Sequence, residues 1–118
     1  MEYAKGRAQF GKPIGKFQAI SHKLADMKVM LEVSKVLIYK FADQVGKGQA
    51  TMHDAAILKL YTSEAYKTIS ALGLQIYGGY GYCMEYPMQR FFRDSRLSVI
   101  GAGSSEMQRN IIAKSLGL

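Results

Sequence analysis

The stretch 17-FQAISHKLADMKVMLEVSKVLIYKFADQV-45 decides the fold class, because its apolar residues recur mainly at steps of three and four. That spacing is the period of an α-helix with one apolar face. The residues of this face are Ile20, Leu24, Met27, Leu31, Ile38, Phe41 and Val45. Gly46 and Gly48 follow and permit a left-handed helix end, with Lys47 beside the negative end of the helix. The sequence therefore predicts a long amphipathic helix from Phe17 to about Val45.

A second helix follows after a short loop. Thr51 or Asp54 can cap its start, since both side chains accept hydrogen bonds from free backbone N–H groups. The glycines of 78-GGYG-81 end it. Its apolar face consists of Ile57, Tyr61, Ala65, Ile69, Leu72 and Ile76.

Two shorter helices are predicted in the last third of the chain. One lies around 88-MQRFFRDSRL-97, directly after Pro87. The other begins at Ser104 or Ser105, either of which can act as the cap, and runs through Leu116.

These elements predict an all-α fold. Two long helices joined by a short loop pack as antiparallel neighbours, and no alternating strand pattern or internal repeat is present. We therefore predict an antiparallel up-and-down helical bundle that forms a single domain over residues 1–118. The opening segment 1-MEYAKGRAQF-10 starts within a helical pattern with no cap before it. We expect a truncated first helix and a chain that is a fragment of a longer protein.

The composition is that of an ordinary globular domain, with 48% apolar and 21% charged residues. No apolar run approaches the roughly 18 residues of a membrane-spanning helix, and the N-terminus has no secretory pattern. We expect neither a membrane segment nor a secretory signal. The single cysteine, Cys83, excludes an internal disulfide and a cysteine-cluster zinc site. These features favour a cytoplasmic location, or the mitochondrial matrix in a eukaryote.

Neither a metal site nor an acid–base pair stands out. His22 and His53 are far apart in the sequence and have no cysteine or second histidine at ligand spacing. No two of the nine acidic residues form an evident general acid and base pair. Cys83 has no histidine near it, so we expect an inert thiol.

The net charge of +7 permits an anionic partner such as nucleic acid, a membrane or a nucleotide-like ligand. The lysines are scattered at helix-surface spacing, so a solvated surface is the expectation for most of them. The arginines are different, because all lie near glycine-rich or turn segments. They are Arg7, Arg90, Arg93, Arg96 and Arg109. A basic nucleic-acid binder stays an alternative, and it predicts strongly salt-dependent binding.

The turn Gly11–Pro13 has both a structural and a ligand-binding interpretation. As a helix–helix connection it would use Phe10 and Ile14 as core anchors. That interpretation leaves the polar residues around the turn unexplained. They are Arg7, Gln9 and Gln18.

The segment 74-LQIYGGYGY-82 also has both a structural and a ligand-binding interpretation. Its glycines follow a helix rather than a strand, so a helix end is more typical of them than a phosphate-binding loop. Closely spaced glycines still let the backbone approach a flat or phosphorylated ligand. The nearby tyrosines favour a core or interface over base stacking. They are Tyr77, Tyr80, Tyr82 and Tyr86. In 90-RFFRDSR-96, we expect an internal ion pair of Asp94 with an arginine to hold the helices together.

The segment 98-SVIGAGSSEMQR-109 has only small residues from Gly101 to Ser105, and its first ionisable group is Glu106. Small residues let a ligand or another segment pass closely. The serine pair is explained most simply as the start of a helix.

Five motifs occur in a fixed order along the chain. They are Tyr3-x3-Arg7-x-Gln9-Phe10-Gly11-x-Pro13-Ile14-x2-Phe17-Gln18, Leu24-Ala25-Asp26-Met27, Gln75-Ile76-x-Gly78-Gly79-x-Gly81-Tyr82, Tyr86-Pro87-x2-Arg90-x2-Arg93-Asp94 and Ile100-x2-Gly103-Ser104-Ser105-Glu106. In this order and register, from about residue 2 to the end, they resemble the C-terminal domain of flavin-dependent acyl-CoA dehydrogenases.

The resemblance implies a helical bundle that follows an N-terminal helical domain and a β-barrel domain in the whole enzyme. It implies FAD as cofactor, a fatty or branched acyl-CoA as substrate, and oxidation of that substrate to the 2-enoyl-CoA. It also implies a tetramer and an electron acceptor such as an electron-transfer flavoprotein. Because the barrel that holds the flavin is absent, we expect the isolated fragment to be inactive.

The resemblance also implies site residues. Contacts with the FAD of a neighbouring subunit are implied for Arg7, Phe10, Gln75, Ile76, Tyr77, Gly78 and Gly79, and a further FAD contact for Gln18. Ser104, Ser105 and Glu106 are implied near the subunit's own FAD, and Ala102 and Gly103 against acyl-CoA. The residue types suit these roles. A guanidinium donates a fork of hydrogen bonds to a diphosphate, and a helix N-terminus directs N–H groups at an anion or carbonyl.

One position departs from many members of the family. The reaction needs a base beside the α-carbon of the thioester, and many members carry a glutamate at the position of Ala102. The turn here is most similar to that of the isovaleryl-CoA dehydrogenase branch, in which the base comes from an earlier helix. We therefore expect no catalytic residue within this chain and a base upstream of Met1.

A non-catalytic helical module remains a second interpretation. An apolar seam left open beside the truncated first helix would favour self-association, so that the fragment dimerises.

Overall fold

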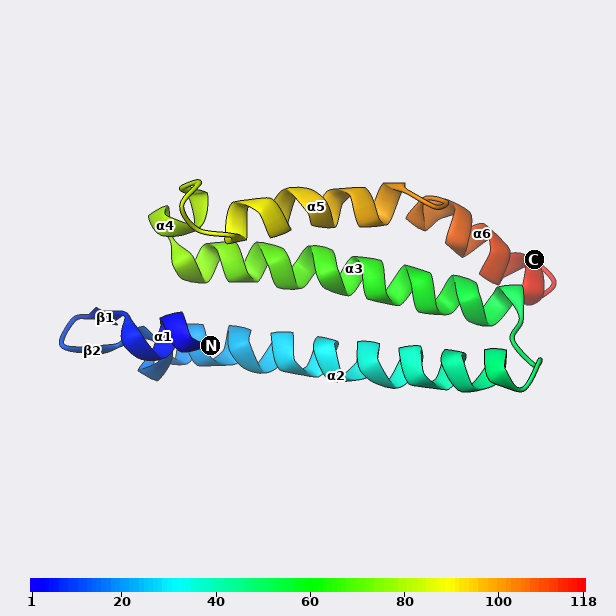
Figure 1. The fold of residues 1–118 in the computed structure, drawn as a ribbon, viewed down its shortest axis with the longest axis horizontal. Coiled ribbons are helices and arrows are strands. Elements are labelled where there is room, and N and C mark those ends of the chain that lie inside the picture. The colour runs from blue at the N-terminus through cyan, green and yellow to red at the C-terminus, as the bar shows by residue number, and fades with distance from the viewer.

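The computed structural model describes all 118 residues and is helical apart from one small hairpin (Figure 1). Its elements are α1 (Glu2–Gly6), β1 (Ala8–Gln9), β2 (Lys12–Pro13), the 3-10 helix η1 (Ile14–Lys16), α2 (Gln18–Gly46), α3 (Met52–Tyr77), α4 (Gly79–Tyr82), α5 (Met88–Ile100) and α6 (Ser105–Ser115). The predicted all-α fold is confirmed. None of the helices combines the length and apolar character that a membrane span needs.

The helices form three layers, with α3 in the middle (Figure 1). α2 runs antiparallel to α3 along one side, while α5 and α6 follow one another back along the other side. The molecule measures 56 × 26 × 23 Å and has a radius of gyration of 17.3 Å. A compact domain of this length has a radius of gyration of roughly 13 Å. The fold is therefore elongated, with its three helical layers side by side along the long axis.

The predicted helix caps are present. The hydroxyl of Thr51 accepts a hydrogen bond from the N–H of Asp54 at 3.1 Å. The hydroxyl of Ser104 accepts one from the N–H of Met107 at 3.4 Å, so Ser104 is the cap of α6. Gly48 has a φ of +65°, which is the left-handed conformation expected after α2.

The turn at Gly11 is a β-hairpin, which the sequence pattern did not predict. Ala8 pairs with Pro13 and Gln9 with Lys12. At the tip, Phe10 and Gly11 have φ values of +53° and +79°, as hairpin turns of two left-handed residues require. Phe10 is 92% exposed. It is therefore not the core anchor that the interpretation of this turn as a helix–helix connection predicts. The sequence did not reveal these strands, because two residues are too few to show the alternation of apolar and polar side chains that is typical of a strand.

Small side chains, not an ion pair, join α5 to α3. The predicted ion pair of Asp94 is wrong, because Asp94 is exposed and takes part in no salt bridge. Instead, the hydroxyl of Ser70 donates to that of Ser95 at 2.8 Å. Ser95 is completely buried and donates in turn to the carbonyl oxygen of Phe92 at 2.7 Å. Both hydroxyls are thus satisfied in the interface.

Glu64 of α3 joins α6 to the middle layer. Its carboxylate accepts a hydrogen bond from the buried Ser105 hydroxyl at 2.9 Å, pairs with Lys67 and lies 4.0 Å from Arg109. The hydrogen bond from Lys67 and then that from Ser105 lower the pKa of Glu64 below its ordinary value. The charged form of Glu64 is therefore the one that the fold stabilises.

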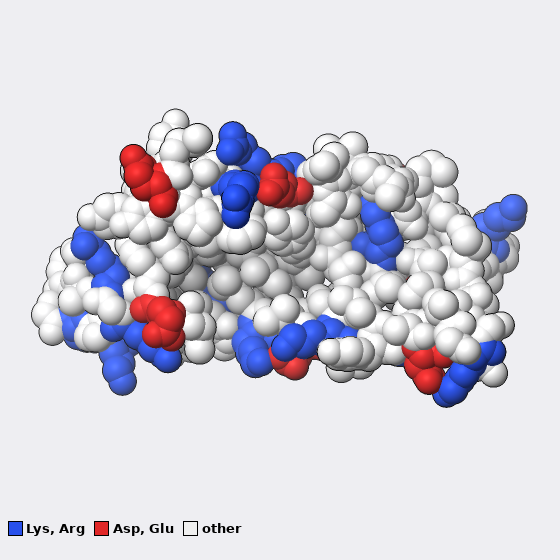
Figure 2. All heavy atoms as spheres, viewed as in Figure 1, with Lys and Arg blue, Asp and Glu red and all other residues white.

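Little of the chain is fully buried. A core cluster of Ala4, Ile14 and Ile76 lies at the end of the molecule where α1 meets α3. Over its 29 residues α2 has no fully buried side chain. Figure 2 shows that Lys, Arg, Asp and Glu lie mainly toward the edges of one broad face, which leaves a wide uncharged area between them.

Two glycines give a paired test of packing. A Cβ at Gly81 would lie 2.6 Å from the backbone oxygen of Leu74, whereas one at Gly73 would lie 2.5 Å from the flexible end of Met88. We expect Gly81→Ala to lower the free energy of unfolding by about 1–3 kcal/mol, because backbone must move. Gly73→Ala should cost much less, since Met88 can turn and alanine favours the helix by about 0.5–1 kcal/mol. Urea unfolding followed by circular dichroism measures both, and equal losses would contradict the packing described.

The stabilising effect of Glu64 should depend on pH. Its folded-state pKa lies below the ordinary value of 4.5, so its contribution is present above pH 4.5 and is lost as the pH falls through the folded-state pKa. We expect Glu64→Gln to lower the melting temperature at neutral pH and to have little effect in strong acid. Glu85→Gln, at an exposed carboxylate without an ion pair, is the control. A Glu64→Gln effect that is the same at both pH values would refute this.

Candidate functional site

A hollow of about 510 Å³ opens where α1, the hairpin, α3 and α4 meet. We call it the arginine hollow. Its lining residues are Tyr3, Arg7, Gln9, Ile14, Ile76, Tyr77, Gly78, Gly79, Tyr80 and Cys83. It brings together five of the residues implied by the family resemblance from two distant parts of the sequence. These are Arg7, Ile76, Tyr77, Gly78 and Gly79.

The main chain is open to the hollow at the end of α3. Gly78 has a φ of +61° and a ψ of −138°, a combination that side-chain-bearing residues rarely adopt. Its N–H group bonds to the carbonyl oxygens of Leu74 and Gln75 at 3.1 and 3.2 Å. A Cβ at Gly78 or Gly79 would meet nothing within 4 Å. A flat ligand could therefore approach the backbone here without a clash.

Tyrosines form the walls of the hollow. The rings of Tyr3 and Tyr77 are stacked with centroids 4.0 Å apart, and the Tyr3 hydroxyl donates to the Tyr77 carbonyl oxygen at 3.2 Å. Burial raises the pKa of Tyr3, although nearby Arg7 opposes this. Tyr80 lies 6.5 Å from Tyr3 and 5.2 Å from Tyr86 between ring centroids. The residue pattern favoured a core or interface for Tyr77, Tyr80 and Tyr86, while the resemblance implied an FAD contact for Tyr77. Neither indicated Tyr3 as a wall of the hollow.

Arg7 is the cation of the hollow. Its guanidinium carbon lies 5.3 Å from the centroid of the Tyr80 ring, within the range of a cation–π contact. Arg7 is exposed and takes part in no salt bridge. Its hydrogen-bond donors are therefore available to an anion.

Three residues with implied FAD contacts do not line the hollow. Phe10 is at the hairpin tip, with its ring centroid 6.2 Å from that of Phe17. Gln18 is the exposed first residue of α2, and Gln75 is exposed on the last turn of α3. Within one chain these three side chains face solvent rather than the hollow.

The second group of implied residues lies at the turn Gly101–Ser104 between α5 and α6, which we call the α5–α6 turn. Ala102 and Gly103 are exposed and both left-handed, with φ values of +53° and +84°. Ser105 is buried and directs its hydroxyl to Glu64. Glu106 is exposed, and hydrogen bonds from its own N–H and then from the Ser104 hydroxyl lower its pKa.

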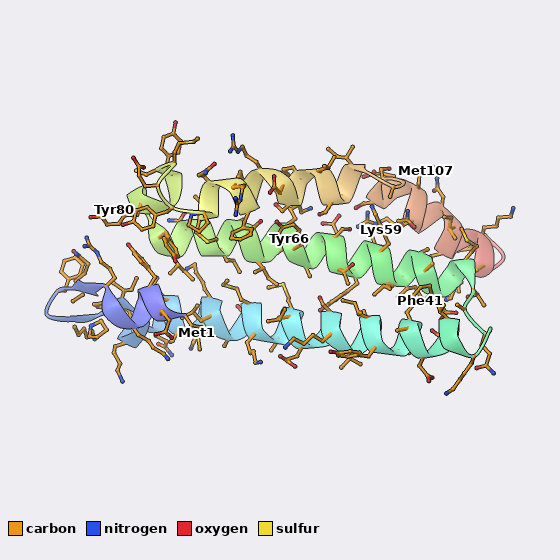
Figure 3. All side chains as sticks on the ribbon, in the orientation of Figure 1. Met1, Phe41, Lys59, Tyr66, Tyr80 and Met107 are labelled. Carbon is orange, nitrogen blue, oxygen red and sulfur yellow. The ribbon has the colours of Figure 1, made fainter.

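Side chains from two helices support this turn. Lys59 of α3 donates to the carbonyl oxygen of Gly103 at 2.6 Å. Gln108 of α6 donates to the same oxygen at 3.1 Å. In Figure 3, Lys59 is labelled on α3 and Met107 on the first turn of α6, where these two helices face each other. Sequence reasoning missed both Lys59 and Gln108, because neither stands in a recognisable motif.

The arginine hollow and the α5–α6 turn are two separate sites. Lys59 of α3 contacts the turn, and Gly78, directly after α3, lines the hollow. At a helical rise of 1.5 Å per residue these two positions are about 28 Å apart. The turn has no carboxylate at Ala102 that could remove a proton. The chain also has no group of three or more His, Cys, Asp or Glu side chains that could hold a metal ion.

Comparison with known proteins identifies the family. A family model described as the acyl-CoA dehydrogenase C-terminal domain matches residues 1–117. The short-chain-specific acyl-CoA dehydrogenase of Megasphaera elsdenii is 45% identical over 108 residues, which are 92% of this chain and 28% of that protein. The mitochondrial isovaleryl-CoA dehydrogenase of Oryza sativa subsp. japonica is 41% identical over 114 residues, 97% of this chain and 28% of that protein. The CarC subunit of the caffeyl-CoA reductase–Etf complex of Acetobacterium woodii is 42% identical over 113 residues, 96% of this chain and 30% of that protein.

Solved structures agree with the sequence relatives. The butyryl-CoA dehydrogenase of Megasphaera elsdenii superposes with a TM-score of 0.96 at 43% identity, over 99% of this chain and 30% of that one. An FAD complex of PigA superposes with a TM-score of 0.94 at 37% identity, with the same coverage of 99% and 30%. The chain thus spans less than a third of the length of each of these proteins. It belongs to the acyl-CoA dehydrogenase family of flavin-dependent oxidoreductases and corresponds to the C-terminal helical domain of that family.

Proposed function

We propose that this chain is the C-terminal domain of an FAD-dependent enzyme that oxidises an acyl-CoA to the 2-enoyl-CoA. The observation that carries the proposal is the arginine hollow, in which an unpaired Arg7 faces the bare backbone of Gly78 and Gly79. A dinucleotide needs this combination of a cation for its diphosphate and a clash-free backbone. The family relationship supplies the identity of that dinucleotide.

The arginine hollow is assigned to the FAD of a neighbouring subunit. Arg7 would hold the diphosphate through its fork of N–H donors. The stacked tyrosines would give a flat wall for an aromatic ring. The exposed side chains of Phe10, Gln18 and Gln75 are free to meet the same cofactor from outside the hollow.

The α5–α6 turn is assigned to the acyl thioester and to the subunit's own flavin. Bound FAD accepts a hydride from the β-carbon of the acyl group. Ala102 and Gly103 would lie against the thioester, and Ser104 to Glu106 beside the flavin. The α-proton requires a base. Because Ala102 has no ionisable group, we assign that base to a glutamate outside residues 1–118, as the isovaleryl-CoA dehydrogenase branch has on an earlier helix.

The substrate and partners follow from the same relationship. The turn sequence favours a short branched-chain acyl-CoA. The names of relatives that work with electron-transfer flavoproteins, among them the Acetobacterium woodii complex, support such a flavoprotein as electron acceptor. We further propose a homotetramer, in the cytoplasm of a prokaryote or the mitochondrial matrix of a eukaryote.

The exposed apolar surface favours a second candidate, a helical module that serves association alone. On α2, Val29 is 62% exposed, Leu31 45% and Val36 65%. Leu31 also lines an apolar hollow of about 430 Å³, which is formed by Met1, Leu24, Ala25, Met27, Lys28, Leu31 and Ile69. Extended apolar surface of this kind marks protein contacts.

A fusion protein tests the flavoenzyme proposal. The part of the Oryza sativa isovaleryl-CoA dehydrogenase that precedes the matched region is joined to residues 1–118. We expect the fusion to bind FAD and to oxidise isovaleryl-CoA with a dye acceptor, whereas the isolated chain does not. Arg7→Ala should weaken FAD binding roughly ten- to a hundredfold, the value of a charged hydrogen bond of about 1.5–3 kcal/mol. Lys5→Ala is the control, and a folded fusion without flavin would sink the proposal.

Sedimentation of the isolated chain tests the association module. We expect self-association, because burying α2 side chains such as Leu31 contributes about 1.5–3 kcal/mol each. Leu31→Lys should weaken association by about tenfold or more. Gln49→Lys adds the same charge on an exposed loop and should leave association unchanged. A wild-type chain that stays monomeric at every concentration rules out this candidate.

A further inference from the structure

Four tyrosines contact one another in a closed circle beside the arginine hollow, and we call them the tyrosine cluster. Tyr3 stacks on Tyr77 with ring centroids 4.0 Å apart, and Tyr77 meets Tyr86 edge to face at 5.9 Å. Tyr86 contacts Tyr80 at 5.2 Å, and Tyr80 returns to Tyr3 at 6.5 Å. Aromatic pairs at these separations attract one another. The cluster therefore connects α1 to the segment between α3 and α5.

The backbone that carries Tyr80 is fixed by close packing. Gly81 is buried, and a Cβ there would lie 2.6 Å from the carbonyl oxygen of Leu74. The N–H of Gly81 donates to the carbonyl oxygen of Gly78 at 2.9 Å. The short helix α4 is thus seated on the last turn of α3. Tyr80 is 41% exposed, whereas Tyr82 of the same helix is 84% exposed and meets no other ring.

Arg7 is fixed at its backbone and contacts Tyr80 with its side chain. Its N–H donates to the carbonyl oxygen of Tyr3 at 2.8 Å, and its own carbonyl oxygen accepts from the N–H of Ile14 at 2.8 Å. The guanidinium takes part in no salt bridge. Its carbon lies 5.3 Å from the centroid of the Tyr80 ring. Figure 3 labels Tyr80 at the end of the molecule where α4 and α1 lie.

This contact orders the guanidinium without using its donors. A guanidinium rests against an aromatic face through its charge, so its N–H groups stay free to bond to another partner. A long side chain loses conformational entropy when a ligand fixes it. A side chain that is already held loses less, which strengthens binding. The charge of Arg7 also reaches the cluster, because it opposes the rise in the pKa of Tyr3 that burial causes.

We propose that Tyr80 is a positioning residue for Arg7, an inference that rests on the proposed function. Tyr80 holds the guanidinium at the arginine hollow, with its N–H donors ready for the diphosphate of FAD. Tyr3 and Tyr86 hold Tyr80 in turn, since both contact its ring. The aromatic face carries this role, and the hydroxyl does not, because a cation is attracted by the face of the ring.

The first test measures FAD affinity in the fusion protein by a double-mutant cycle. Tyr80→Leu should weaken FAD binding about two- to thirtyfold, the range of a cation–π contact. Tyr80→Phe keeps the ring and should retain the wild-type affinity. In an Arg7→Ala background, Tyr80→Leu should have no further effect, because Tyr80 acts through Arg7. Tyr82→Leu removes an exposed tyrosine from the same helix and is the matched control.

The second test uses the isolated chain and needs no ligand. The ring current of Tyr80 should move the proton NMR signals of the Arg7 side chain away from those of a free arginine. Tyr80→Leu should abolish this displacement, and Tyr80→Phe should keep it. Tyr86→Leu removes a support of Tyr80 and should reduce it. Tyr82→Leu should leave it unchanged.

The outcomes separate the positioning role from a structural role and from the proposed function. An equal loss of FAD affinity from Tyr80→Leu with and without Arg7 would mean a structural role only and would overturn the proposal. So would a Tyr80→Phe variant as weak as Tyr80→Leu, or wild-type Arg7 signals like those of a free arginine. If the wild-type fusion holds no FAD, the flavoenzyme function fails, and the Arg7 signals still decide whether Tyr80 holds Arg7. Tyr80→Met takes the place of Tyr80→Leu if that variant does not fold.

Discussion

The close contact of α5 with α3 is the constraint on which the arrangement of this domain depends. α3 is covered on two sides, by α2 and by α5 with α6, and the side chains that are fully buried where α5 meets it, Ser70 and Ser95, are small. Ser70 and Ser95 meet there through a hydrogen bond of 2.8 Å between their hydroxyls. That bond holds Ser95 of α5 against Ser70 of α3, and further along the same two layers the α5–α6 turn lies beside Lys59. The backbone end of the same helix, at Gly78, forms part of the arginine hollow. One helix therefore sets the positions of both candidate sites.

The period of the apolar residues and the helix-capping side chains were sufficient to predict the long helices. α2 and α3 could be predicted because an apolar stripe over more than twenty residues has no other stable interpretation, and Thr51 and Ser104 mark helix starts by local hydrogen bonds. The β1–β2 hairpin and α4 could not, since elements of two to four residues carry no period. The predicted ion pair of Asp94 failed for a different reason. Opposite charges within one helix sequence do not show which face meets a neighbour, and Asp94 lies on the exposed face.

Sequence reasoning identified only those residues of the candidate sites that belong to short motifs. Arg7 and Gly78 belong to such motifs, and the fold brings them into one hollow although they are more than seventy residues apart. Tyr3 joins that hollow through stacking on Tyr77, a contact that no local pattern encodes. The support of the α5–α6 turn was equally hidden. Lys59 looks like any surface lysine in the sequence, and its role depends on a hydrogen bond to a carbonyl 44 positions away.

The structure shows where the residues that make up the net charge of +7 lie and which of them have a partner of opposite charge. Several lysines are neutralised locally, because Lys28 and Lys35 share Glu32, and Lys47 pairs with Asp43. Such exposed pairs contribute little to stability, but they remove lysines from the free positive charge of the surface. Arg7 and Lys59 have no carboxylate partner, and each lies at one of the two candidate sites. Under the proposed function, Arg7 would meet the diphosphate of FAD, so this unpaired cation has a specific ligand, and a nucleic-acid partner is not needed to explain it.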